Sequence, residues 1–336
     1  GIDGQTLTIE KSLLKLEPGR TSTNAILNLS IKSSQGGRHT ITLPSGAQLQ
    51  EVKIQGRIRP IRQDQNKVVL PIVPGKQEIS LRWIDKQSIS TRYKTPEVDL
   101  GIESANTSVD IALPRNRWPL FIGGEQLSGP AVLFWSVVIV ILIIAFGLSK
   151  TRWTPLNFFH WFLLCIGMSM SHLGAGIVVV AWLVALDFRQ RAGNLKGAIF
   201  NLVQVGILVL TLAAAACLVF AISNGLLGHP DMNIRGNGSS ASLLRWYHDV
   251  SGPVLPQAWV ISIPMLAYRI AMLAWALWVS FWLINILKWG WSQFTTPKFW
   301  ENISFNFSRK KSSPKMELDL DEDEADAEEE TGKEDK

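Results

Sequence analysis

Cysteine and histidine are scarce in this chain, and neither is arranged as a reactive centre. The two cysteines, Cys165 and Cys217, lie inside apolar stretches, and the first 129 residues contain none. That distribution excludes a disulfide framework and a zinc-type cysteine spacing in the N-terminal part. Both thiols are interpreted as small buried hydrophobic groups. We therefore expect no cofactor and no metal, and we assign no residue to catalysis.

Charge is absent from residues 130–149, PAVLFWSVVIVILIIAFGLS. A helix of that length rises about 30 Å, the thickness of the hydrocarbon core of a bilayer. By segment, residues 1–129 carry 17 basic and 12 acidic side chains, residues 130–300 carry 10 and 3, and residues 301–336 carry 6 and 13. The basic residues are scattered, without the clustered stripe that a nucleic-acid surface needs. We expect a lipid bilayer as a partner and no nucleic acid.

Helical periodicity is missing from residues 1–116, where short alternating runs recur between turn signals such as Pro74-Gly75. Alternation with a period of two places the apolar residues on one face of a half-buried strand. Two such runs are Leu27, Leu29, Ile31 and Ile79, Leu81, Trp83. The pattern predicts an N-terminal antiparallel β-sandwich-like domain. Residues 117–129 are predicted to be an interfacial join, because Trp118 and Phe121 suit the membrane surface.

A basic cluster lies within this domain, where Arg57, Arg59 and Arg62 flank Ile58 and Ile61. A solvated strand face is the favoured interpretation. Recognition of an anionic glycan, a lipid headgroup or a protein partner is the alternative.

Five apolar segments predict a polytopic transmembrane helix bundle over residues 130–290. The segments are 130–149, 156–170, 173–187, 198–222 and 259–287. The second and third are about 22 Å long as helices. They are predicted to form a short hairpin, made either of two thin spans or of a re-entrant loop. In the last segment, Trp275, Trp278 and Trp282 step by three and four and share one helix face.

Loop charge orients these segments. Lys150 and Arg152 follow the first, while Arg189, Arg191 and Lys196 precede the fourth. The positive-inside rule places both groups in the cytoplasm and so requires an even number of crossings between them. The resulting topology has five passes in a bacterial inner membrane, with residues 1–116 and a 223–258 loop in the periplasm. Leu243–Tyr247 within that loop are predicted to form a short interfacial helix.

Residues 291–336 are predicted to be a cytoplasmic disordered acidic tail. The sequence MELDLDEDEADAEEETGKEDK has too little apolar content to bury a core. A basic partner is one possible use for it. The chain starts at Gly1 without a signal peptide, and we expect it to be the C-terminal part of a longer protein.

The candidate functional residues fall into two groups. In the last span, Arg269 lies beside Tyr268, and a charge within hydrocarbon costs roughly 2.5–3.5 kcal/mol on insertion scales. Arg269 is interpreted either as an anchor at the membrane surface or as a residue for a ligand or ion. If Arg269 serves a ligand or ion, His172 at the turn of the short hairpin is expected to take part in the same site.

The second group lies in the 223–258 loop and consists of His229, Asp231, His248 and Asp249. Two imidazoles and two carboxylates suit a metal or acid–base chemistry, provided that they converge. Their spacing matches no established metal motif.

Several stretches resemble the C-terminal region of a family of large, uncharacterised Gram-negative (proteobacterial) inner-membrane and periplasmic envelope proteins of unknown function. The stretches are LPIVPGKQEISLRW (70–83), TPEVDLG (95–101), RWPLFIGGEQLSGPAVLFW (117–135), GNGSS…LRWYHD (236–249) and LPQAWVISIPMLAYRIAMLAWALW (255–278). The resemblance implies an inner-membrane address and a longer periplasmic portion, and it implies no activity.

We therefore expect a non-enzymatic envelope component that acts as a scaffold, a sensor or a docking module for other envelope proteins. One alternative is a transporter or channel subunit that uses Arg269 and the broken 155–187 hairpin. A second alternative is a membrane enzyme that works at the outer face through the 223–258 loop.

Overall fold

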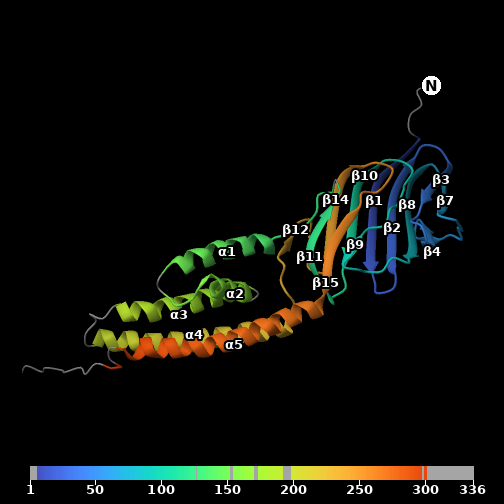
Figure 1. The fold of residues 1–336 in the computed structure, drawn as a ribbon. Coiled ribbons are helices and arrows are strands. Elements are labelled where there is room, and N and C mark those ends of the chain that lie inside the picture. The colour runs from blue at the N-terminus through green and yellow to red at the C-terminus, as the bar shows by residue number, and fades with distance from the viewer. Residues whose placement is uncertain are drawn as a thin grey trace, which may run out of the picture.

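The structure, a computed structural model, describes residues 6–125, 127–151, 154–169, 173–191, 198–296 and 299–300. A β domain stands at one end of the molecule and a group of helices extends from it (Figure 1). Two of the helices, α4 (Ala198–Leu227) and α5 (Met265–Thr295), are long and apolar enough to cross a membrane. The predicted β-rich N-terminal region and the apolar helices of the C-terminal half are thus confirmed. The predicted acidic tail after residue 300 lies outside the described residues.

A seven-stranded sheet forms the largest layer of the β domain. Its order is β14 (Leu243–Ser251), β10 (Ser104–Ala112), β1 (Leu7–Pro18), β2 (Thr23–Ser33), β8 (Gly75–Asp85), β4 (Gln48–Ile54) and β5 (Arg57–Ile58). The alternating runs form its central strands, in which Leu27, Leu81 and Trp83 are fully buried. Neighbouring strands are antiparallel except β1 and β10, which are parallel. The sheet is therefore mixed and not purely antiparallel as predicted.

Three small sheets complete the domain. They are β3 (Gly37–Thr42), β7 (Lys67–Ile72) and β6 (Gln63–Asp64); β11 (Arg117–Gly124), β15 (Ala258–Pro264) and β9 (Arg92–Lys94); and β12 (Ala131–Val132) with β13 (Ile234–Arg235). Ile41 and Val68 from the first small sheet share one core with Leu81 and Ile111 from the large sheet. Apolar side chains therefore fill the space between layers, as in a sandwich.

The prediction that residues 223–258 form a loop is wrong, because this segment contains two strands of the β domain, β13 and β14. β14 pairs along its length with β10, and Leu244 and Trp246 point into the core while Arg245 points outward. The same period-two pattern that identifies the N-terminal strands is therefore present here. The predicted short helix at Leu243–Tyr247 is the first part of this strand.

The predicted boundaries of the interfacial join and of the last apolar helix also change. Residues 117–124 are not a linker but strand β11, and β15 pairs with it from Arg117↔Pro264 to Gly124↔Ala258. The last span therefore starts at Met265 and not at residue 259. The β domain is built from two separate stretches of chain, because β13, β14 and β15 return to it after four helices.

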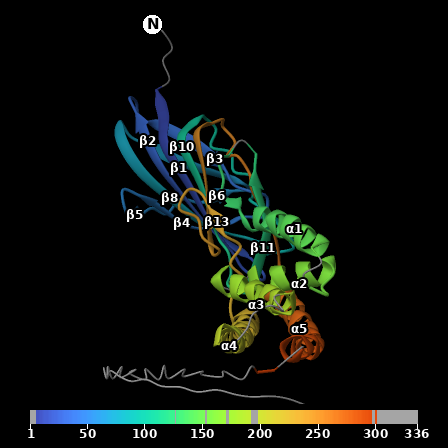
Figure 2. The same ribbon diagram turned by 90° about the vertical axis from the view of Figure 1, so that its left-hand side faces the viewer.

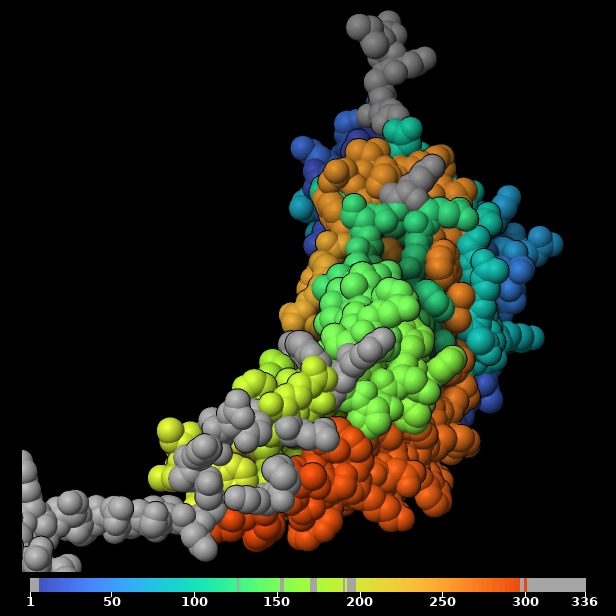
Figure 3. All heavy atoms as spheres, turned by 60° about the vertical axis from the view of Figure 1, so that its left-hand side comes forward, coloured from blue at the N-terminus to red at the C-terminus, as the bar shows by residue number. Residues whose placement is uncertain are grey.

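The helices α1 (Phe134–Lys150), α2 (Phe158–Ser169) and α3 (Leu173–Arg191) precede α4 and α5. α1, α3 and α5 run away from the β domain, and α2 and α4 run back toward it (Figure 1). Seen from the side, α1 and α2 lie above α4 and α5 (Figure 2). Figure 3 shows the green surface of α1 and α2 between the β domain and the orange-red surface of α5.

Candidate functional site

The candidate site is the junction at which strand β15 passes into helix α5 and the neighbouring strand β11 contacts the starts of α1 and α5. The two strands pair to their ends, and the backbone N–H of Met265, the first residue of α5, donates to the carbonyl of Asn116 over 2.9 Å. On the other side of β11, the indole N–H of Trp135 in α1 donates to the carbonyl of Leu120 over 2.8 Å. One strand thus fixes the starting positions of two helices.

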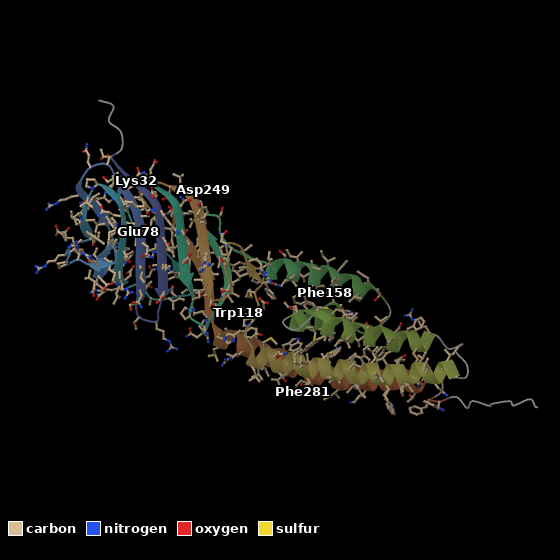
Figure 4. All side chains as sticks on the ribbon, turned by 180° about the vertical axis from the view of Figure 1, so that it is seen from behind. Lys32, Glu78, Trp118, Phe158, Asp249 and Phe281 are labelled. Carbon is tan, nitrogen blue, oxygen red and sulfur yellow. The ribbon has the colours of Figure 1, made fainter. Side chains whose placement is uncertain are left out.

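Trp118 connects the two hydrophobic cores. Its ring packs against the core of the β domain and also against the core of the helices. The ring meets Tyr268 of α5 edge-on, with centroids 5.1 Å apart (Figure 4 labels Trp118 at this boundary). Such edge-to-face pairs add about 0.5–1.5 kcal/mol beyond the area they bury. Tyr268, a candidate from the sequence, is therefore a packing residue of the junction.

Arg117 hydrogen-bonds to residues of the β domain at the junction. Its Nε donates to Ser262 Oγ over 3.1 Å, and its terminal nitrogen donates to the carbonyls of Ser262 (2.7 Å) and Ser90. Burial lowers the pKa of Arg117, because removing water penalises the charged form. The ion pairs that the structure describes involve neither Arg117 nor its neighbour Arg115.

A pocket of about 290 Å³ lies beside this arginine. Arg115, Arg117 and His229 line it, together with Ser242 from the segment before β14 and Met265 from the start of α5. α5 begins without a side-chain cap and has no acidic residue in its first turn. The pocket therefore joins basic side chains to the positive end of a helix dipole.

Arg269 lies on the outward face of α5, four residues after the helix begins. The buried stripe of α5 includes Tyr268 and Met272, whereas Arg269 is exposed between the exposed residues Leu266 and Ile270. Its Cα is only about 6 Å along the helix from Met265. That position fits the predicted anchor, because an arginine near the end of a membrane-spanning helix extends its long side chain to the membrane surface. His172, its predicted companion, lies outside the described residues.

The four residues of the predicted loop do not converge. His229 lines the pocket with Ser242, whereas His248 is six positions further along β14, roughly 20 Å at the rise of a strand. The carboxylate of Asp231 accepts the backbone N–H of Asn233 over 2.8 Å, which stabilises its own turn. Asp249 stands near the end of the sheet remote from the helices (Figure 4). No group of three or more metal-ligating side chains occurs among the described residues.

A buried polar cluster at the other end of the helices was not singled out from the sequence. Arg189 of α3 is 4% exposed and donates to Gln204 Oε1 of α4 over 2.5 Å, and its guanidinium also donates to the carbonyls of Gln293 and Thr296 at the end of α5. Gln204 in turn donates to the carbonyl of Phe294 over 3.0 Å. The cluster ties three helices together at their far ends. Its sequence signal is weak: Gln204, like Asn201 three residues earlier, is a polar residue in a largely apolar run.

Comparisons with known proteins identify no family. No family model matches the chain, and no curated protein matches it. Among solved structures, the chain is similar to the M1 zinc metallopeptidase of Deinococcus radiodurans at 13% identity, with a TM-score of 0.30 over 38% of this chain and 36% of that one. A mutant of an M1 zinc metallopeptidase bound to L-tryptophan gives 12% identity and a TM-score of 0.30. This chain spans less than two fifths of those proteins, and likeness at that level carries no argument about function.

Proposed function

We propose that this protein is a non-enzymatic envelope scaffold in which a periplasmic β domain is held rigidly on a bundle of membrane helices. The observation that carries the proposal is the junction: β11 fixes the starts of both α1 and α5, and Trp118 packs in both cores. A connection made of paired strands transmits position and orientation, which a flexible linker does not. That property suits a module that presents a docking surface at a fixed height.

The outward surfaces of the long helices support a membrane location. Only 22% of the apolar window of α4 and 33% of that of α5 is buried within the chain, so most of their apolar side chains need another apolar environment. On α5 the exposed charges Arg269 and Lys288 enclose an apolar face that includes Leu273 and Phe281. The two charges are separated by roughly 28 Å of helix, close to the thickness of the hydrocarbon core.

Five passes follow if α1, α2 and α3 also cross. Lys150 ends α1, and Arg191 ends α3. Both helices end away from the β domain (Figure 1), so both charges fall on one side, as the positive-inside rule requires. α1 and α2 are about 25 and 18 Å long, which makes them short spans. In the proposed topology the helices cross a bacterial inner membrane and the β domain lies in the periplasm.

The docking surface is proposed at the tip of the β domain around β5, the edge of the large sheet opposite β14. Ile58 is 66% exposed and Val73 is 54% exposed, and Arg57 and Arg59 line a pocket with Ile61 beside them. Exposed aliphatic groups framed by arginines suit a partner protein with an apolar residue flanked by carboxylates.

Site-specific photo-crosslinking in intact cells tests this function. A photoreactive residue replaces Ile58 in the wild-type chain, and the same residue at Lys32, on the exposed outer side of β2, is the matched control. We expect Ile58 to yield a discrete protein adduct that is lost in the Arg57→Glu, Arg59→Glu variant, and Lys32 to yield none. Equal adducts at both positions, or none at Ile58, would reject the docking surface.

The alternatives receive less support from the described residues. A transporter needs Arg269 to face a polar cavity, whereas it lies on the outward face of α5. An enzyme at the outer face needs His229 and His248 to share one site, and more than half of β14 lies between His248 and the pocket that His229 lines.

A further inference from the structure

The pocket at the junction has the composition of an anion site. Two arginines and one histidine line it, and none of its described lining residues is acidic. Arg115 and His229 are exposed, so both can turn toward a ligand. Arg117 is half-buried and held in place by its bonds to Ser262 and Ser90. A fixed guanidinium without a carboxylate partner is available to a negatively charged group.

The start of α5 adds a second, independent attraction for an anion. Met265 forms part of the pocket wall, and the helix that starts there has neither a side-chain cap nor an acid in its first turn. The N–H of Met265 already donates to the carbonyl of Asn116, so the attraction comes from the next N–H groups of the first turn and from the helix dipole, which favour negative charge. Asp231, which follows the lining residue Pro230, directs its carboxylate to the N–H of Asn233 in its own turn.

The position of the pocket specifies the ligand further. It lies where β11 begins, beside the start of α5, and Arg269 is one helical turn further along α5. If the proposed membrane mounting holds, this is the level of the lipid headgroups. The phosphates of phospholipids are the most abundant anions at that level.

We propose that Arg115, Arg117, His229 and the start of α5 bind the phosphate of an anionic lipid headgroup in the leaflet nearest the β domain. This inference rests on the proposed membrane mounting. A bound headgroup would neutralise the pocket and connect the β domain to the membrane surface beside the Trp118 contact. The same chemistry would also accept free phosphate, so the experiment separates the two sources.

Native mass spectrometry of the full-length protein in detergent provides the first measurement. Dioleoyl phosphatidylglycerol is the probe, and dioleoylglycerol, which has the same acyl chains and no phosphate, is the reference lipid. We expect phosphatidylglycerol to be retained and dioleoylglycerol to be lost. Because hydrogen bonds to charged groups contribute about 1.5–3 kcal/mol, Arg115→Gln combined with His229→Gln should weaken retention roughly tenfold or more.

Both substituted residues are exposed, so that variant is expected to fold even if Arg117→Gln does not. The matched control is Arg57→Gln with Arg59→Gln, which removes two charges at the remote tip and should leave retention unchanged. Titration calorimetry with inorganic phosphate forms the second arm. Binding of phosphatidylglycerol alone identifies the lipid as the source, and binding of both identifies a general phosphate site.

Equal retention of phosphatidylglycerol by the wild type and the Arg115→Gln, His229→Gln variant would overturn the assignment. The membrane mounting is tested separately by alkaline extraction of membranes from expressing cells. If the protein resists extraction but the wild type and the variant retain phosphatidylglycerol equally, the lipid site in the pocket is overturned and the proposed scaffold stands. If alkaline treatment extracts the protein, the proposed membrane mounting is overturned, and the proposed binding of a lipid headgroup is overturned with it.

Discussion

At the scale of single residues, the junction depends on a few side chains that contact two parts of the molecule at once. Trp118 packs in both cores and meets Tyr268, while Arg117 bonds to Ser262 and Ser90 across neighbouring strands. These residues are expected to control the angle between domain and helices more than the stability of either part.

The substitution Trp118→Ala tests that role. It removes the ring that both cores share, so we expect the β domain to move relative to the helices. The measurement is the distance distribution between spin labels at Lys32→Cys and Phe281→Cys, in a background of Cys165→Ala and Cys217→Ala. The distribution should be narrow in the parent and broader in the variant.

Trp291→Ala, an exposed tryptophan near the far end of α5, is the control and should leave the distribution narrow. An unchanged distribution in Trp118→Ala would mean that the paired strands alone set the angle.

Tyr93 in β9 provides a test of burial in the β domain. It is fully buried, and burial, aided by the charge of Asp85, raises its pKa to about 12. Between pH 10 and pH 12 the unfolded chain loses this proton while the folded chain keeps it, so stability falls as pH rises through that window. The loss amounts to about 2–3 kcal/mol, at 1.36 kcal/mol for each pKa unit.

The Tyr93→Phe variant should not show this part of the loss of stability at alkaline pH. The loss is measured as the difference between the free energies of unfolding at pH 9 and pH 12, each obtained from a denaturant titration. The wild type should lose about 2–3 kcal/mol more than the variant between these values. Identical losses in the two proteins would show that Tyr93 titrates normally in the fold.

At the scale of elements, the helices pack through small residues that admit large rings. A side chain on Gly167 of α2 would place its Cβ 1.9 Å from Cε2 of Trp275 in α5, whose indole N–H donates to the carbonyl of Leu163 over 2.8 Å. Trp282 is also buried in this face and stacks on Trp278. The three-and-four spacing of these tryptophans therefore forms one packing surface.

Gly167→Ala should separate α2 from α5. Overpacking of this kind costs about 1–3 kcal/mol, which lowers the thermal midpoint of the protein in detergent as followed by circular dichroism. Gly206→Ala in α4, where an added Cβ meets nothing within 4 Å, is the control and should be neutral or slightly stabilising. A neutral Gly167→Ala would contradict the α2–α5 contact.

The sequence predicts the strands of residues 1–116 and the presence of apolar helices well, because period-two alternation and long uncharged runs are local signals. It fails where pairing partners lie far apart. Leu243–Ser251 alternates clearly, yet its position between two apolar segments predicts a loop. Its partner β10 is more than 130 residues earlier, so no local signal shows the pairing.

The same limit applies to the helix start and to the buried polar cluster. Residues 258–264 are as apolar as the helix that follows, and only pairing with β11 makes them a strand. Arg189 has the sequence pattern of a loop charge, because its acceptors on α4 and at the end of α5 lie 15 and more than 100 residues away. Contacts of that separation depend on the fold and not on the local pattern.

At the scale of the whole molecule, the proposed scaffold has its β domain and the far ends of its helices on opposite sides of a membrane. The decisive measurement is labelling of single cysteines by a membrane-impermeant maleimide in intact spheroplasts, in the background without Cys165 and Cys217. Arg57→Cys and Ala241→Cys report on the β domain, and Lys150→Cys and Arg191→Cys report on the far ends of α1 and α3.

We expect the first two positions to react at once and the last two to react only after the membrane is permeabilised. Labelling of all four positions from the outside would contradict the membrane-mounted scaffold.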